Sequence, residues 1–476
     1  MSQLQVFNTL TARKEDFVPL AGKSVLMYVC GPTVYDVSHL GHARKEIVFD
    51  VIQRYLRCCG YDVTYVRNIT DIDDKIINRA AERDWRPEQI AREYTYQFWH
   101  DMRNLGIAAP DFEPRATEFI YPMIAFAQDL IEKGHAYASD GDVYFEVSSF
   151  REYGKLKKQD LEELLVGARE QVRSQDELKE RKRCPLDFAL WKGAQPGDPG
   201  WDAPWGRGRP GWHLECSTMI KHVLGETIDI HGGGEDLVFP HHENEIAQSE
   251  ALHGRPLARY WLHNSFVQVD SEKMSKSLGN FSTIQDILRT YSPDTVRLFV
   301  LQTHYRSPIE FSTDSLNATK AGLQRLVRAA GSITEAEAAA LQDRQAVGDS
   351  HLTKEVMGRF DAEFSAAMNS DFNTAAAVSV LFALADQVFL ESDASRRLSY
   401  IYALEKFAAV LGLTLNDTSQ QLDSDSGSGL IELILKLRQE ARDKKDYATS
   451  DLIRAHLSKL GIKVMDSADG ATWERS

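Results

Sequence analysis

The sequence is poor in cysteine, with five in 476 residues, scattered along the chain. So few cysteines cannot build a disulfide framework, and their odd number is typical of a reducing compartment. Apolar runs of 18 or more residues are also absent, and the first twenty residues mix charged with apolar side chains. These features argue against a membrane span and a signal peptide. We therefore expect a soluble, cytoplasmic protein.

An excess of positive charge is missing too. The 55 Lys and Arg residues face 70 Asp and Glu residues, which leaves a formal net charge of −15. No global field therefore attracts nucleic acid, and any such partner must be bound by a local patch. The last 48 residues are less acidic than the rest, with nine Lys or Arg against eight Asp or Glu. They are the expected nucleic-acid contact.

Residues 25–69 carry the pattern of a strand, a helix and a second strand. Residues 25–29 are an apolar run, residues 47–56 repeat apolar side chains at helical spacing, and alternation from Val63 predicts the next strand. Such units form parallel sheets and bind nucleotides beyond the carboxyl end of the strand. The segment from Cys30 to His42 occupies that position.

Further along, the charged segment 134–195 predicts an insertion into this α/β sheet. Strands are expected at 227–230 and 261–269, with a turn at Gly232 to Gly234 and a helix beginning near Pro240. Residues 317–412 are rich in Ala and Leu at helical spacing and predict a helical bundle. Residues 416–429 are polar and rich in Ser, Asp and Gly, as in a linker.

Two histidines, His39 and His42, flank Gly41 at the expected helix start. Imidazoles at this spacing lie on one helix face, beside backbone N–H groups and the positive end of the dipole, which suits a polyphosphate. The alternative is a pair of capping or half-buried histidines. The motif alone favours that alternative.

Two lysines, Lys273 and Lys276, stand in a small loop rich in hydroxyl groups that follows an expected strand. Such a loop can act as a mobile cationic clamp on a leaving pyrophosphate. A solvated basic turn is the alternative interpretation.

Cys216, His241 and Glu245, together with the distant Cys30, have the chemistry of a zinc site. His241 and Glu245 are four residues apart on an expected helix, and thiolates are ligands that zinc favours. No Cys-x-x-Cys pair is present, so packing thiols and surface histidines remain the alternative.

The run His231 to Gly234 resembles the oxyanion loop of some esterases. The chain has no G-x-S-x-G nucleophile elbow, which leaves that interpretation without a nucleophile. A tight loop that lets a nucleoside approach the backbone, with Asp236 beside an amine, fits better.

The strings HLGH at 39–42 and KMSKS at 273–277 resemble the two signatures of class I aminoacyl-tRNA synthetases. Within that class, several further strings resemble the cysteinyl-tRNA synthetase family: YVCGPTVYD at 28–36, NITDIDDK at 68–75, GWHLEC at 211–216 and the segment 231–245. DFNT at 371–374 and GATW at 470–473 resemble that family's helical and C-terminal pieces.

The resemblance implies ATP-dependent ligation of L-cysteine to tRNA(Cys) through a cysteinyl-adenylate, with Mg²⁺ accompanying ATP and a monomeric enzyme. It implies one Zn²⁺ per chain. The implied site residues are Cys30, Cys216, His241 and Glu245 for the metal, His39, Gly41, His42, Lys273 and Lys276 for ATP and catalysis, and Gly31, Thr70, Trp212 and Asp236 for the substrate.

The resemblance also implies a division of the chain. A Rossmann-type catalytic domain comprises 1–133 and 196–268, a connective domain is inserted at 134–195, and 269–316 holds the lysine loop and a stem-contact region. A tRNA-binding helical bundle at 317–415, a linker at 416–429 and an anticodon-recognition domain at 430–476 follow.

Three alternatives stay open at this point. A tRNA-independent ligase could join cysteine to a small amine, but it would not need the C-terminal module. A zinc hydrolase would leave the lysine loop unexplained, and a non-catalytic nucleotide or RNA binder would not need the zinc cluster with both phosphate motifs. One departure from the family pattern has no explanation in the sequence: Lys45 and Glu46 place a charged pair directly after the histidine motif.

Overall fold

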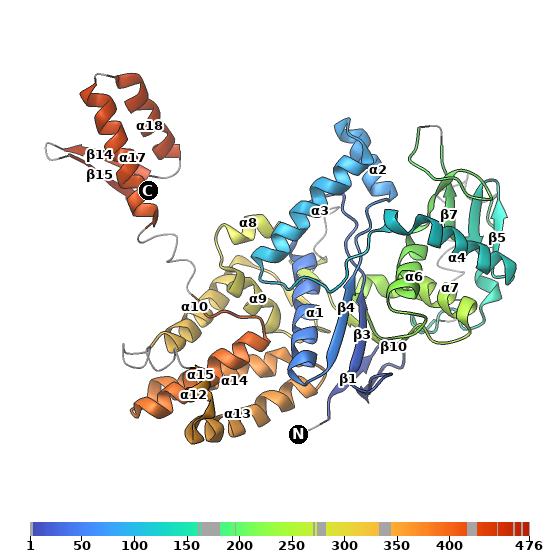
Figure 1. Ribbon diagram of the computed structural model, residues 1–476, viewed down its shortest axis with the longest axis horizontal. Helices are drawn as coiled ribbons and strands as arrows, with labels where there is room; N and C mark the ends of the chain where they lie inside the picture. Colours follow the sequence, from blue (N-terminus) through green and yellow to red (C-terminus); the bar gives the residue numbers. More distant parts are fainter. Residues whose placement is uncertain are drawn as a thin grey trace. The chain divides into compact units, whose positions relative to one another are not determined.

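The computed structural model describes residues 3–159, 163, 181–195, 197–269, 272–273, 282–332, 344–416, 426–444, 446–459, 462–467 and 470–475 (Figure 1). Contacts divide the chain into two compact units, Met1–Leu415 and Asn416–Ser476. Each unit is described by itself.

A parallel four-stranded sheet with the strand order β10-β9-β3-β4 forms the centre of the first unit. Its strands are β3 (Ser24–Val29), β4 (Asp62–Arg67), β9 (Ile228–Gly234) and β10 (Ala258–Asn264). Helix α1 (Leu40–Cys58) connects β3 to β4 and packs against the sheet (Figure 1). The strand–helix–strand unit and the α/β class are therefore confirmed, and the carboxyl ends of all four strands meet at one edge.

Two predicted elements of this sheet were wrong in detail. Gly232 to Gly234 lie inside β9 instead of forming a turn, since they pair with Leu262 to Asn264 of β10. A Cβ at Gly232 would meet the Phe49 ring of α1 at 2.3 Å. The glycines thus serve close packing of helix on strand. The strand expected at 261–269 is two strands, since β10 ends at Asn264 and β11 (Val267–Val269) joins another sheet with β12 (Glu272–Lys273) and β13 (Ile309–Glu310).

An antiparallel sheet, β5-β6-β7-β8, stands beside the central one and has its own hydrophobic core. Its strands are β5 (Ala136–Ser139), β6 (Asp142–Phe145), β7 (Phe188–Gly193) and β8 (Gly208–Pro210). The inserted sheet thus extends to Pro210, past the expected boundary at 195. The sequence did not indicate β8 because a short edge strand that contains Gly and Pro gives no strand pattern.

The helices around the two sheets are α2 (Asp74–Arg83), α3 (Pro87–Asn104), α4 (Ile120–Glu132), α6 (Trp212–Val223) and α7 (Glu243–His253), with short turns η1 (Ala116–Phe119), η2 (Val147–Ser149), η4 (Glu235–Leu237) and η5 (Val238–His242). The hairpin β1 (Gln5–Asn8) and β2 (Arg13–Asp16) lies against β10. Residues 164–180 of the insertion fall outside the described part of the chain.

Helices complete the first unit: α8 (Ile284–Leu288), α9 (Pro293–Leu301), α10 (Thr313–Ala330), α12 (Arg344–Asp349), α13 (His351–Asn369), α14 (Thr374–Leu390) and α15 (Ala394–Val410). The last three pack on one another and share a single core with the central sheet. The helical bundle expected after residue 317 is therefore confirmed for the residues described.

Arg297 of α9 joins the bundle to the sheet region through a buried ion pair. Its guanidinium lies 2.6 Å from Asp50 of α1 and donates to the carbonyls of Leu105 and Leu411, while both charged side chains are at most 1% exposed. Gly412 passes so close that a Cβ would meet the guanidinium at 1.9 Å, and its φ is +71°. Only glycine fits there.

Asp371 makes a second connection between the same parts. Its buried carboxylate accepts hydrogen bonds from the Phe7 amide at 2.8 Å, the Tyr305 hydroxyl at 2.8 Å and the Arg306 Nε at 2.7 Å. Arg44 of α1 in turn donates to the carbonyl of Tyr305 at 3.1 Å. The connection between α13 and α14, the N-terminal hairpin and helix α1 are thus all joined to the segment of Tyr305 and Arg306, which leads into β13.

The second unit contains α17 (Ser426–Asp443), α18 (Tyr447–Lys459) and an antiparallel hairpin of β14 (Ile462–Ser467) and β15 (Gly470–Arg475). Leu435, Leu457 and Val464 form its small core. None of the helices described in either unit combines the length and the apolar character that crossing a bilayer requires.

We predict that Arg297→Met lowers the free energy of unfolding by about 3–5 kcal/mol, because it leaves Asp50 without its buried counter-charge. The midpoint of urea-induced unfolding should fall accordingly. Circular dichroism across a urea series measures this. Arg289→Met is the matched control, since Arg289 forms an exposed pair with Asp286 and should cost less than about 0.5 kcal/mol. Equal midpoints for the two variants would contradict the prediction.

Candidate active site

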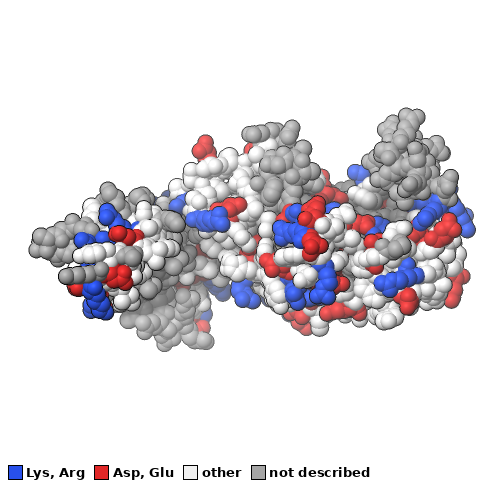
Figure 2. Space-filling view, turned by 90° about the horizontal axis from the view of Figure 1, so that it is seen from above, with Lys and Arg blue, Asp and Glu red and all other residues white. Residues whose placement is uncertain are grey.

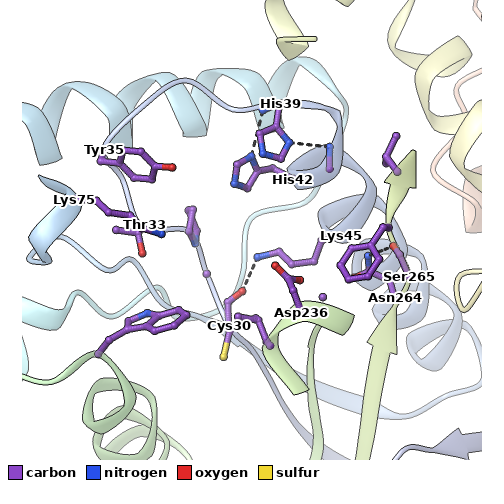
Figure 3. A pocket seen from close by; sticks show the side chains of 18 residues that line it. Cys30, Thr33, Tyr35, His39, His42, Lys45, Lys75, Asp236, Asn264 and Ser265 are labelled. Atoms are coloured by element: carbon purple, nitrogen blue, oxygen red, sulfur yellow. Dashed lines mark hydrogen bonds between the residues drawn. The ribbon is translucent and has the colours of Figure 1, made fainter. Parts of the chain in front are cut away.

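A cavity of about 540 Å³ opens at the carboxyl edge of the central sheet. Its walls come from the segment that follows β3, from the first turns of α1, from η4 and from the segment that follows β10 (Figure 3). This is the position where parallel sheets bind ligands. The size suits a nucleotide or an amino-acid derivative.

His39 and His42 cap helix α1 at one wall of this cavity. The Nδ1 of His39 accepts a hydrogen bond from the Gly41 amide at 3.0 Å, and the Nδ1 of His42 accepts one from the His39 amide at 3.2 Å. The ring centroids are 4.0 Å apart, and all three residues line the cavity. The capping alternative is therefore correct, and it coexists with a place in the cavity wall because capping orients both rings at the helix N-terminus.

Cys30, Cys216, His241 and Glu245 form one buried cluster of potential metal ligands. Cys30 Sγ lies 3.7 Å from Cys216 Sγ and 3.5 Å from Glu245 Oε1, and His241 Nε2 lies 3.6 Å from Cys216 Sγ and 3.0 Å from Glu245 Oε1. Ligand atoms around a tetrahedral Zn²⁺ lie about 3.3–3.8 Å apart, given Zn–S of about 2.3 Å and Zn–N of about 2.0 Å. The donor types and the three distances that involve a sulfur atom fit this ion, while His241 and Glu245 lie closer together, at hydrogen-bond distance.

The cluster is strongly polarised. Burial opposes ionisation of Cys216, yet hydrogen bonds with Cys30 and His241 outweigh it and lower the pKa of Cys216 to about 6. Burial likewise opposes protonation of His241, but Glu245 and Cys216 raise its pKa to about 10. Burial and the neighbouring Cys216 hold the pKa of Cys30 well above its usual range. A metal ion bound here would displace the protons of His241 and Cys30, because these side chains bind metals in their deprotonated forms.

Further histidines surround the cluster. His231 Nε2 lies 2.8 Å from Glu245 Oε2, His242 Nε2 lies 3.3 Å from Cys30 Sγ, and the other nitrogen of His242 lies 2.8 Å from His263 Nε2. Burial lowers the pKa of His242 well below its usual value and that of His263 to about 3, so both are neutral. These distances are those of hydrogen bonds, which orient the ligand side chains.

An alternative ligand set exists within the same cluster. Cys30, His231, His242 and Glu245 also bring four donor atoms together, so two overlapping sets share Cys30 and Glu245. One carboxylate oxygen of Glu245, Oε1, faces both Cys30 and His241, whereas His231 lies against the other oxygen, Oε2. This geometry favours the first set as the candidate metal ligands, with His231 and His242 as their hydrogen-bond partners.

Three of the four expected substrate residues line the cavity: Gly31, Trp212 and Asp236. Gly31 must be glycine, because a Cβ would lie 1.6 Å from the carbonyl oxygen of Asn68. The Trp212 ring stacks on His241 with centroids 4.1 Å apart. The indole thus lies between the cavity and the cluster of potential metal ligands.

Thr70 lies behind the wall instead. Its side chain is buried and donates to Glu215 at 2.7 Å, and its amide donates to the carbonyl of Pro32. Burial raises the pKa of Glu215 well above its usual value. Thr70 is therefore placed to hold the 32–34 segment of the wall.

The lysine loop can be placed only at its start. Lys273 ends β12, which pairs with β11 next to the cavity residue Val267. The side chain of Lys273 and all of 274–281, Lys276 included, lie outside the described residues.

The cavity and the surroundings of the cluster contain several residues that were not predicted from the sequence. Lys45, Lys75 and Asn264 line the cavity, and His213 meets the second nitrogen of His241 at 2.9 Å. Their positions depend on contacts between elements. The sequence did contain signals for three of them: Lys45 is half of the charged pair that departs from the family pattern, and Lys75 and His213 lie in the strings 68–75 and 211–216 that resemble the family.

Family models match most of the chain. The model for the catalytic domain of class I (C) tRNA synthetases matches residues 16–321, a DALR domain matches 363–416, and the anticodon-binding domain of cysteinyl-tRNA ligases matches 428–473.

Solved structures share the fold at low sequence identity. A methionyl-tRNA synthetase of Mycobacterium tuberculosis in complex with methionyl-adenylate has a TM-score of 0.54 at 17% identity, covering 87% of this chain and 94% of its own. The LeuRS of a ternary LeuRS–tRNA–LeuAMS complex from Agrobacterium radiobacter has a TM-score of 0.62 at 12% identity, covering 86% of each chain.

Full-length relatives are much more similar. The cysteine–tRNA ligase of Geobacter sulfurreducens is 49% identical over 487 residues, which cover 99% of both chains, and that of Heliobacterium modesticaldum is 48% identical over 485 residues, which cover 99% of this chain and 100% of the relative. Similarity of this extent, together with the matching catalytic domain, shows that this chain belongs to the cysteine–tRNA ligase family of class I aminoacyl-tRNA synthetases.

Proposed function

We propose that this chain attaches L-cysteine to tRNA(Cys) in two steps, first forming cysteinyl-adenylate and pyrophosphate from cysteine and Mg²⁺-ATP. One observation carries the proposal: a single cavity is lined both by Cys30, a member of the cluster of thiols, and by His39 and His42 at a helix N-terminus. One end suits a sulfur-containing substrate and the other a polyphosphate.

Zn²⁺ would be held by Cys30, Cys216, His241 and Glu245, and it would supply a Lewis acid that binds a substrate thiolate and has little affinity for a hydroxyl. This gives a physical reason for excluding serine, which differs from cysteine only by oxygen in place of sulfur. Packing alone discriminates such pairs weakly. Trp212, stacked on His241, would cover the side chain of the bound amino acid.

The phosphate chemistry needs positioning and charge neutralisation instead of a protein nucleophile. His39 and His42, oriented by their capping hydrogen bonds, would bind the α-phosphate at the N-terminus of α1. Lys273 and Lys276 would follow the charge of the departing pyrophosphate. Asp236 would bind the substrate ammonium, and Gly31 and Gly41 let ligand and backbone approach closely.

The second unit favours tRNA over a small amine as the acceptor. Its residues 428–473 match an anticodon-binding domain, which a tRNA-independent ligase would not need. Figure 2 shows Lys and Arg interspersed with Asp and Glu on the described surface in view. We therefore assign tRNA recognition to particular segments, the bundle at 317–415 and the domain at 430–476, in a monomeric cytoplasmic enzyme.

We predict ATP–pyrophosphate exchange with cysteine, and none with serine or methionine, in the absence of tRNA. The zinc content of the preparation is measured in parallel. Subsequent transfer of labelled cysteine to tRNA would identify the acceptor, and transfer to a small amine with no transfer to tRNA would favour the alternative. Exchange with none of the amino acids by a zinc-loaded preparation would contradict the proposed function.

Cys216→Ser should lower zinc content and cysteine affinity together, because the variant lacks one thiolate ligand and leaves three donors. Atomic absorption and the KM for cysteine in the exchange reaction measure the two effects. Cys58→Ser is the matched control, since Cys58 is exposed at the far end of α1. Normal zinc content with an unchanged KM in Cys216→Ser would refute the ligand assignment.

A further inference from the structure

The charged pair that follows the histidine motif divides between two environments. Glu46 turns to the sheet, where its carboxylate lies 2.6 Å from Arg67 of β4 at 1% exposure. Burial alone would raise the pKa of Glu46, but Arg67 and Lys45 outweigh it and hold the pKa below its usual value. Arg67 also binds Glu113, so this cation is shared between two carboxylates.

Lys45 turns to the cavity. Its ammonium donates to the carbonyl oxygen of Cys30 at 2.5 Å and lies 3.0 Å from Glu46 Oε1, with 11% of the side chain exposed. These two described contacts use two of the three N–H donors of an ammonium. The third N–H donor is on the same ammonium, which belongs to a side chain that lines the cavity.

The position of this ammonium is informative. Figure 3 shows Lys45 reaching from α1 to Cys30, with His39 and His42 further along the same cavity. Lys45 follows His42 by three residues on α1, so it stands one helical turn beyond the phosphate-binding end. The other described cation of the cavity, Lys75, instead lies over the Tyr35 ring at 5.5 Å.

We propose that Lys45 contacts the substrates of adenylation, neutralising charge where the carboxylate of the amino acid meets the α-phosphate of ATP. The inference rests on the proposed function. A thiol side chain bound near Cys30 and a polyphosphate bound near His39 place these two anionic groups in the space between, where Lys45 lies. Two anions that must come into contact repel each other, and a fixed cation between them lowers that cost.

The step needs no proton transfer to or from Lys45. A carboxylate oxygen forms a bond to the α-phosphorus, the bond from that phosphorus to the bridging oxygen of the β-phosphate breaks, and pyrophosphate leaves with the electron pair. Lys45 stays an ammonium throughout, and Glu46 stays its buried counter-ion. Lys45 thereby differs from a general acid or base.

A purely structural role makes a different prediction. If Lys45 only supports the carbonyl of Cys30, then an uncharged donor at this position should suffice, and its loss should disturb the metal ligands. Lys45→Gln keeps an N–H donor without the charge, and Lys45→Met removes both while keeping an unbranched side chain. Lys23→Met is the matched control, because Lys23 is exposed in the turn before β3, at the opposite end of that strand.

The test measures ATP–pyrophosphate exchange, zinc content and the binding of cysteine without ATP for the full-length wild type and the three variants. We expect Lys45→Met and Lys45→Gln to lower the maximal exchange rate about 100-fold, with zinc content and cysteine affinity as in the wild type. Lys23→Met should match the wild type throughout.

Two results would overturn the proposal about Lys45 alone: exchange by Lys45→Gln at the wild-type rate, or loss of zinc in parallel with the rate. If Lys45→Met does not fold, as judged by circular dichroism, Lys45→Gln carries the test. A zinc-loaded wild type that exchanges with no amino acid would overturn the proposed function and this inference together.

Discussion

Burial of three acidic groups, Cys30, Cys216 and Glu245, within one small volume is the constraint on which the rest of the site depends. Charges removed from water are costly unless they are paired and hydrogen-bonded. The fold meets this cost with His241 inside the cluster and with His231 and His242 around it. Each of these supports comes from a sheet strand or from the α7 entry turn, so the surrounding elements keep the donor atoms within ligand distance of one another.

The same need for compensation extends from the cluster to the central sheet. Lys45 joins the backbone of Cys30 to Glu46, and Glu46 joins Arg67 on the neighbouring strand. Helix α1 and the carboxyl end of β3, where Cys30 lies, are therefore connected by a continuous set of charged contacts. Lys45 and Arg67 both neutralise Glu46, so the loss of either cation leaves this buried carboxylate with one remaining counter-charge.

The identities of many site residues could be predicted from the sequence, but the contacts between them could not. Residue types and short spacings identified His39, His42, His241 and Glu245, because helical periodicity fixes which of them share a face. Periodicity could not place Lys45 or His263, whose neighbours lie on other elements. The prediction of a turn at the glycines of β9 was wrong for the same reason. Gly232 contacts the Phe49 ring of a helix that is distant in the sequence, and the local pattern alone favoured a turn.

The ligand cluster joins residues that are far apart in the chain, since Cys30 precedes Cys216 by 186 positions. On the ribosome, the first thiol emerges long before the other three donors exist. The site can form only after Glu245 has been synthesised, by which point the whole insertion and strand β9 have also been synthesised. A metal ion that requires all four donors could therefore bind only late in biosynthesis, after both halves of the central sheet have been synthesised.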